Sequence, residues 1–83
     1  MIGVSGSGNS VNVLKAIEYA RRNGGETIGL CGYSGGRLYE MVAIPLLAEV
    51  NDMQMVEDIH MIIVHMAMQR IRQRGALDIV KAI

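Results

Sequence analysis

The sequence predicts an α/β fold, in which a parallel sheet is flanked by helices. Short apolar runs alternate along the chain with segments of helical spacing, in the order strand, helix, strand, helix, strand, helix. The connections are short, and the chain contains ten glycines but a single proline. This alternation is typical of parallel sheets, because helical crossovers join their strands.

The apolar runs have the length and composition of buried strands. Pro45 lies near the start of the last run, where its missing N–H group does least harm. The predicted strands span residues 1–4, 26–31 and 44–50.

The helical segments carry recognisable start and stop residues. Ser10 and Asp52 are predicted N-caps, Gly24 is predicted to follow the end of the first helix, and Gly75 to end the last. We therefore expect one domain over residues 1–75 and a short helical tail over residues 76–83. The predicted helices span residues 11–23, 37–42 and 52–73.

The composition excludes several classes of protein. With 51% apolar residues the chain is not disordered, and a formal net charge of zero gives no electrostatic footprint for nucleic acid. We see no signal peptide and no apolar stretch of the roughly 20 residues that span a bilayer. We therefore expect a cytoplasmic protein without a membrane or nucleic-acid partner, in which the lone Cys31 is a small buried residue.

The last predicted helix is apolar on almost all sides between Met61 and Met68. A helix of this kind is normally buried, and 83 residues are too few to bury it. We expect this helix to pack against further protein, either a second subunit or additional sequence.

A small polar loop, Ser-Gly-Ser-Gly-Asn-Ser at residues 5–10, follows the first predicted strand. Ligands of open α/β sheets bind beyond the carboxyl ends of the strands, and a helix N-terminus suits an anion. The loop therefore predicts a phosphate site, with a plain tight turn as the alternative. No Lys-Ser or Lys-Thr follows the glycines and their spacing is not G-x-G-x-x-G, which excludes the triphosphate and dinucleotide motifs.

These residues resemble the sugar isomerase (SIS) domains. Residues 3–10 with 12–16 are similar to the phosphosugar-binding loop and helix of that family, and residues 27–38 to its next strand and glycine turn. Residues 51–65 resemble the last helix of the phosphoheptose isomerase branch, which acts on sedoheptulose 7-phosphate. The resemblance implies part of a flavodoxin-like three-layer sandwich.

The resemblance also implies a site. Ser5, Ser7 and Ser10 would hold the phosphate, with Gly6 where the branch often has Thr. His65 would be a catalytic proton-transfer group, and Glu57 would bind substrate or metal. The metal would be zinc, with Glu57 and His65 as ligands, although zinc needs two more ligands than this pair supplies. His60 is expected to have a structural role.

SIS domains are more than twice as long as this chain, which matches their C-terminal half. The full-length parent would be a homo-oligomer, a dimer or a tetramer, and would supply the remaining metal ligands and a catalytic Glu. We expect part of an aldose–ketose isomerase of a sugar phosphate. The alternatives are a non-catalytic phosphosugar sensor and an inactive truncated fragment; Glu57 and His65 favour the enzyme, because a sensor needs only the loop.

Overall fold

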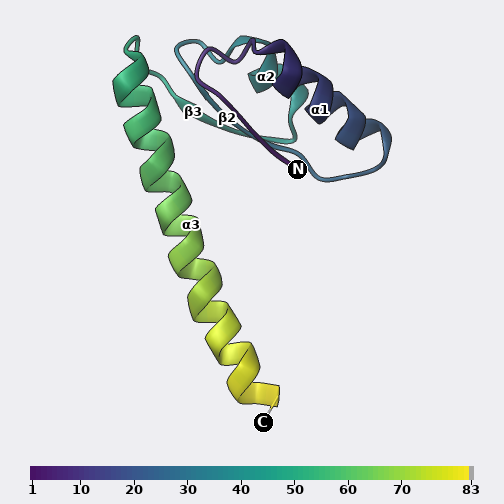
Figure 1. The fold of residues 1–83 in the computed structure, drawn as a ribbon, viewed down its shortest axis with the longest axis vertical. Coiled ribbons are helices and arrows are strands. Elements are labelled where there is room, and N and C mark those ends of the chain that lie inside the picture. Colours follow the sequence, from purple (N-terminus) through teal and green to yellow (C-terminus); the bar gives the residue numbers. More distant parts are fainter. Residues whose placement is uncertain (83) are drawn as a thin grey trace.

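The computed structural model describes the backbone of residues 1–82 and the side chains of residues 1–75. Strands and helices alternate through this range, as the sequence predicts (Figure 1). Each observed boundary lies within two residues of its prediction, apart from the end of the last helix. The elements are β1 (Ile2–Ser5), α1 (Val11–Arg22), β2 (Ile28–Gly32), α2 (Gly36–Met41), β3 (Ile44–Ala48) and α3 (Met53–Ala82).

The strands of residues 1–82 form one parallel sheet in the order β1-β2-β3. The register places Ser5 beside Cys31, and Cys31 beside Leu47. All carboxyl ends of the strands therefore meet at one edge of the sheet. This arrangement confirms the predicted α/β class.

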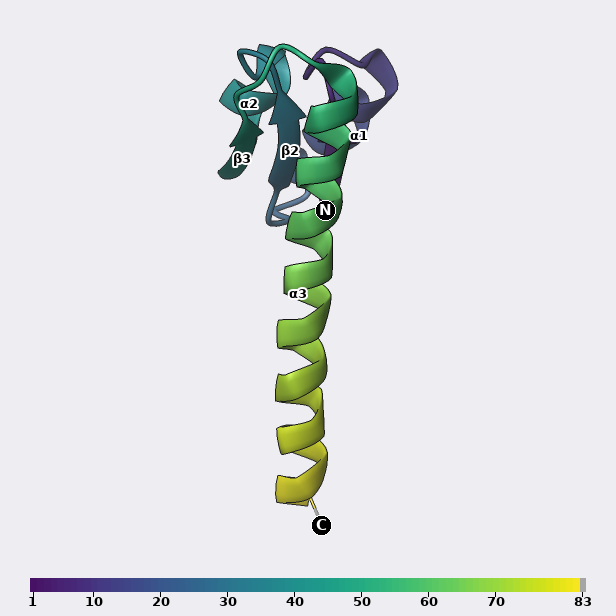
Figure 2. The same cartoon turned by 90° about the vertical axis from the view of Figure 1, so that its left-hand side faces the viewer.

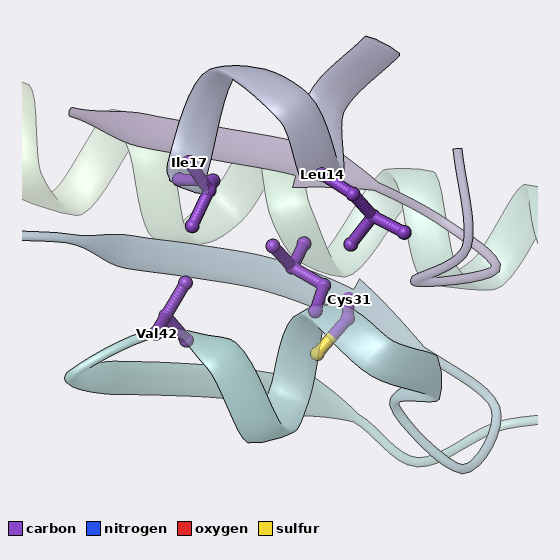
Figure 3. Close-up of a cluster of buried hydrophobic side chains, with 5 residues drawn as sticks. Leu14, Ile17, Cys31 and Val42 are labelled. Carbon is purple, nitrogen blue, oxygen red and sulfur yellow. The ribbon is translucent and has the colours of Figure 1, made fainter. Parts of the chain in front are cut away.

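The helices cover both faces of the sheet, which gives three layers (Figure 2). α1 and α2 pack on one face, and the first part of α3 packs on the other. Between α1, α2 and the sheet lies the main apolar core (Figure 3), and its buried side chains exclude water from that face. The cluster consists of Leu14, Ile17, Cys31, Leu38 and Val42.

α3 begins at a well-formed cap. The Asp52 carboxylate accepts hydrogen bonds from the N–H groups of Gln54 at 3.0 Å and Met55 at 3.3 Å, which confirms it as the N-cap. One turn later the Val56 side chain is completely buried against the sheet. With 30 residues the helix is about 45 Å long, which matches the longest dimension of the molecule, 46 Å.

The prediction that Gly75 ends the last helix is wrong, because α3 continues through it to Ala82. Gly75 does not adopt the left-handed conformation that terminates a helix, and a Cβ added there would meet no other atom within 4 Å. A glycine inside a helix costs about 1 kcal/mol relative to alanine, which is too little to stop it. Of the predicted tail, Ile83 lies outside the described residues.

The far half of α3 extends away from the sheet (Figure 1). Up to residue 75, where side chains are described, this half exposes large apolar residues. Met66 and Ile71 are about two-thirds exposed, at 65% and 69%. Packing of this surface against further protein stays a prediction. Over the described residues, no helix combines the length and apolar character that crossing a bilayer requires.

Candidate functional site

Residues 5–10, which we call the serine loop, leave β1 at the carboxyl edge of the sheet and lead directly into α1 (Figure 1). The Ser5 side chain is buried, with 4% of its surface exposed, whereas Ser7 is exposed and Ser10 is half-buried. The serines therefore have different surroundings, although the sequence motif treats them alike.

Ser5 holds the loop closed. Its hydroxyl oxygen accepts the N–H of Gly8 at 3.1 Å and that of Ser10 at 3.4 Å, and it lies 2.9 Å from the Ser10 hydroxyl. A hydroxyl has two acceptor positions and one donor. Because two N–H groups fill the acceptor positions, the Ser5 O–H donates to Ser10.

Ser7 and Ser10 keep hydroxyl donors for a ligand. Ser10 accepts from Ser5, and Ser7 accepts the Asn9 N–H at 3.1 Å, so neither proton is used by these contacts. Ser10 occupies the N-cap position of α1 as predicted, but its side chain makes no capping hydrogen bond. The first N–H groups of α1 therefore remain available to an anion.

The turn at residues 32–36, which we call the glycine turn, packs against the side of the serine loop. Leu38 N–H donates to the Gly8 carbonyl at 2.9 Å, and Arg37 N–H donates to the Asn9 side-chain oxygen at 3.0 Å. Gly8 has a φ of 74° and Gly36 one of 57°. A Cβ on Gly8 would overlap the neighbouring backbone, so this close approach requires glycine.

Asn9 is a site residue that the sequence reasoning missed. Its side chain lies in the serine loop but caps the start of α2, whose residues come 28 positions later in the chain. An N-cap is normally recognised just before its helix, so no local pattern identifies Asn9.

The other side of the loop is covered by the start of α3. A Cβ on Gly6 would lie 2.8 Å from the Met53 methyl carbon, and would also overlap the Met53 sulfur. Met53 therefore fills the space that a side chain at position 6 would occupy. Binding of a ligand by the Gly6 backbone stays a prediction.

Beside the loop, α3 and the sheet line an open hollow of about 410 Å³. Glu57 and His60 provide its polar groups, and the rest of its lining is apolar. The His60 ring is buried, with 5% exposed, and its Nε2 lies 2.8 Å from the Cys31 carbonyl oxygen. The apolar lining residues are Val4, Leu30, Met61 and Val64.

Cys31 is buried, as predicted from the sequence. Burial raises the pKa of its thiol, because the apolar surroundings disfavour the charged thiolate. A thiol that stays protonated is a poor nucleophile, so Cys31 serves the core.

His65 lies away from the serine loop of its own chain. Its position is twelve residues after Met53, which corresponds to about 18 Å along α3. Glu57 precedes His65 by eight residues, or about 12 Å. The structure thus places Glu57 near the serine loop and His65 beyond it, and both side chains are exposed.

The zinc set implied by the resemblance does not fit this chain alone. Among the described side chains, no three His, Cys, Asp or Glu residues gather closely enough to hold a metal ion. A zinc site requires three or four protein ligands, and Glu57 and His65 supply two.

Comparison with known proteins finds curated relatives that cover most of the chain. It is 44% identical over 73 residues to a phosphoheptose isomerase of Trichlorobacter lovleyi, covering 88% of this chain and 37% of the relative. Proteins of the same name from Aliarcobacter butzleri and Fusobacterium nucleatum are 42% identical over 65 residues and 39% over 72. These alignments cover 78% and 87% of this chain, and 34% and 37% of those relatives.

No family model matches the sequence. The chain spans about a third of the length of the curated relatives it matches. The shared segment includes most of the α/β unit described above. Over most of its length the chain is therefore similar to about a third of a phosphoheptose isomerase, consistent with part of a sugar isomerase (SIS) domain.

Proposed function

We propose that this chain binds the phosphate of a sugar phosphate in its serine loop, as part of an aldose–ketose isomerase. The proposal rests on the different hydrogen bonding of the three serines. Ser5 shapes the loop, while Ser7 and Ser10 keep free hydroxyl donors. The name of the relatives supports a heptose phosphate as the substrate, and the resemblance seen in the sequence implies sedoheptulose 7-phosphate.

The loop suits a phosphate monoester for electrostatic reasons. Neutral hydroxyl donors and the N-terminal N–H groups of α1 stabilise an anion, and the loop carries no carboxylate that would repel it. A hydrogen bond to a charged group contributes about 1.5–3 kcal/mol. Two hydroxyls and the helix N-terminus would together provide specific binding of the phosphate.

Holding the phosphate places the opposite end of the sugar for reaction. Isomerisation moves a proton between C1 and C2 through an enediol, which requires an acid and a base at that end. Binding energy from the remote phosphate then lowers the barrier by fixing the reacting atoms in position. We assign sugar contact to Glu57, which lies nearer the serine loop than His65.

We propose His65 as one proton-transfer group of the assembled protein. Because it lies about three helical turns beyond the serine-loop contact of its own chain, its role requires protein surfaces that these residues do not supply. Further sequence or a second subunit would bring it to a bound sugar, and would cover the exposed apolar residues of α3.

The proposal is tested by titrating the chain with sedoheptulose 7-phosphate and with sedoheptulose in a calorimeter. We expect binding of the phosphorylated sugar alone, and a loss of about tenfold in affinity for Ser7→Ala, equal to about 1.4 kcal/mol. Ser34→Ala changes an exposed serine outside the loop and should leave the affinity unchanged. His65→Ala should also bind normally. Equal affinity for the two sugars would contradict the proposal.

A further inference from the structure

α3 contacts β2 through Val56 and His60, which are four residues apart. Asp52 caps the helix, and Val56 lies over Gly32, where a Cβ would come within 2.6 Å of both Val56 methyl groups. His60 follows at the same spacing and reaches the carbonyl of Cys31, the residue before Gly32. The helix therefore runs back along β2.

The His60 contact is a directional hydrogen bond, unlike the apolar contact that Val56 makes with the sheet. A carbonyl oxygen only accepts hydrogen bonds, so Nε2 of His60 carries the proton and donates it to Cys31. Small shifts of α3 would leave Val56 buried, because apolar contact has no preferred direction. A buried N–H···O bond of 2.8 Å is satisfied only near one position of the helix.

The position fixed by this bond also sets where Glu57 lies. Glu57 precedes His60 by three residues, so both lie on one side of α3, and both line the same hollow beside Val4 and Leu30. A rotation or slide of α3 would move the carboxylate of Glu57 relative to the serine loop, which begins directly after Val4.

We propose that His60 is a positioning residue, whose hydrogen bond to the Cys31 carbonyl sets the register of α3 on β2 and holds Glu57 beside the serine loop. The part of this inference that concerns Glu57 and the sugar rests on the proposed function. The part that concerns the register of α3 does not.

The register is tested without ligand by nuclear Overhauser contacts in the full chain. The Met53 methyl group should show a contact to Gly6, and Val56 methyl groups should show contacts to Gly32. His60→Leu should lose or shift both sets. His60→Gln should retain them, because its amide N–H replaces Nε2–H at similar reach.

A core variant supplies the control for lost stability. Ile17→Val removes one buried methyl group on the opposite face of the sheet and should leave the α3 contacts in place. Unchanged contacts in His60→Leu would overturn the proposal. Absence of these contacts in the unsubstituted chain would overturn it as well.

The ligand measurement compares sedoheptulose 7-phosphate with inorganic phosphate, which probes the serine loop alone. In His60→Leu the preference for the sugar phosphate over inorganic phosphate should fall about tenfold, as in Glu57→Gln. The affinity for inorganic phosphate should stay unchanged. His60→Gln should restore the preference. An equal fall for both ligands would show a general structural effect and overturn the positioning role. If the unsubstituted chain binds neither ligand while the register contacts respond as expected, the proposed function fails and the register part of the inference stands.

Discussion

The hydroxyl groups of Ser5 and Ser10 lie 2.9 Å apart and join the end of β1 to the start of α1. Because Ser5 also accepts two backbone N–H groups, this one buried side chain determines the shape of the serine loop. Ser7 is exposed on the same loop, and its hydroxyl contributes to the loop shape only through the hydrogen bond from the Asn9 N–H. Loop shape and ligand contact are therefore separable by mutation.

Ser5→Ala should lower both stability and phosphosugar affinity. The change removes the side-chain acceptor of the Ser10 N–H, whereas the Gly8 N–H still donates to the Ser5 carbonyl at 3.0 Å. A buried polar group that loses its partner costs about 1–3 kcal/mol. Ser7→Ala should change stability by less than about 0.5 kcal/mol, because its side chain is exposed. Chemical denaturation of both variants measures the difference, and equal stability would contradict the assigned roles.

Gly8→Ala should be far more destabilising than Gly24→Ala. The two glycines have nearly the same φ, 74° and 75°, so the backbone strain of an added Cβ is matched. Gly24 has open space around it, whereas a Cβ on Gly8 would meet the backbone of Gly35. Thermal melts of both variants isolate the effect of this close approach. Similar melting temperatures would show that the serine loop and the glycine turn do not touch.

Alkaline pH should destabilise the chain through Cys31. Burial raises the pKa of its thiol above the ordinary value of 9.0, so above that pH the unfolded chain releases a proton that the folded chain keeps. The stability contribution is complete below pH 9 and is lost as the pH rises through the folded-state pKa. Cys31→Ala should show a shallower decline between pH 8 and about pH 10.5 in denaturation experiments. An equal loss of stability with pH in Cys31→Ala and the unsubstituted chain would contradict a buried thiol.

Gly75→Ala should raise the helix content measured by circular dichroism. Alanine is favoured over glycine inside a helix by about 1 kcal/mol, and no neighbouring atom obstructs the added methyl group. If α3 instead ended at Gly75 in a left-handed conformation, alanine would be strained there and helix content would fall. Global stability should change little, because this part of α3 extends away from the sheet (Figure 1).

Local patterns predict the order of the elements, because each strand and helix is specified by its own residues. The parallel sheet follows from that order, and Asp52 and Gly24 act where the capping rules place them. The serine loop is also identified from its own residues, since glycines and hydroxyls lie together before a helix.

Contacts between distant segments are what the sequence does not reveal. Asn9 caps a helix 28 positions later, and His60 reaches a carbonyl 29 positions earlier in the chain. The spacing of His60 and Glu57 is equally compatible with an exposed helix surface, and only the packing of α3 on β2 shows that the ring is buried. Gly75 shows the opposite error, in which a local stop signal is overridden by the rest of the helix.

The most direct test of the phosphosugar site is a thermal melt of the 83-residue chain with and without sedoheptulose 7-phosphate. We predict a cooperative melt that shifts upward with ligand, since binding to the folded state at 100 times the Kd adds about 2.7 kcal/mol. Ser7→Ala should require a higher ligand concentration for the same shift. A cooperative melt that the sugar phosphate does not move would contradict the site, and the absence of a cooperative melt would support an inactive fragment.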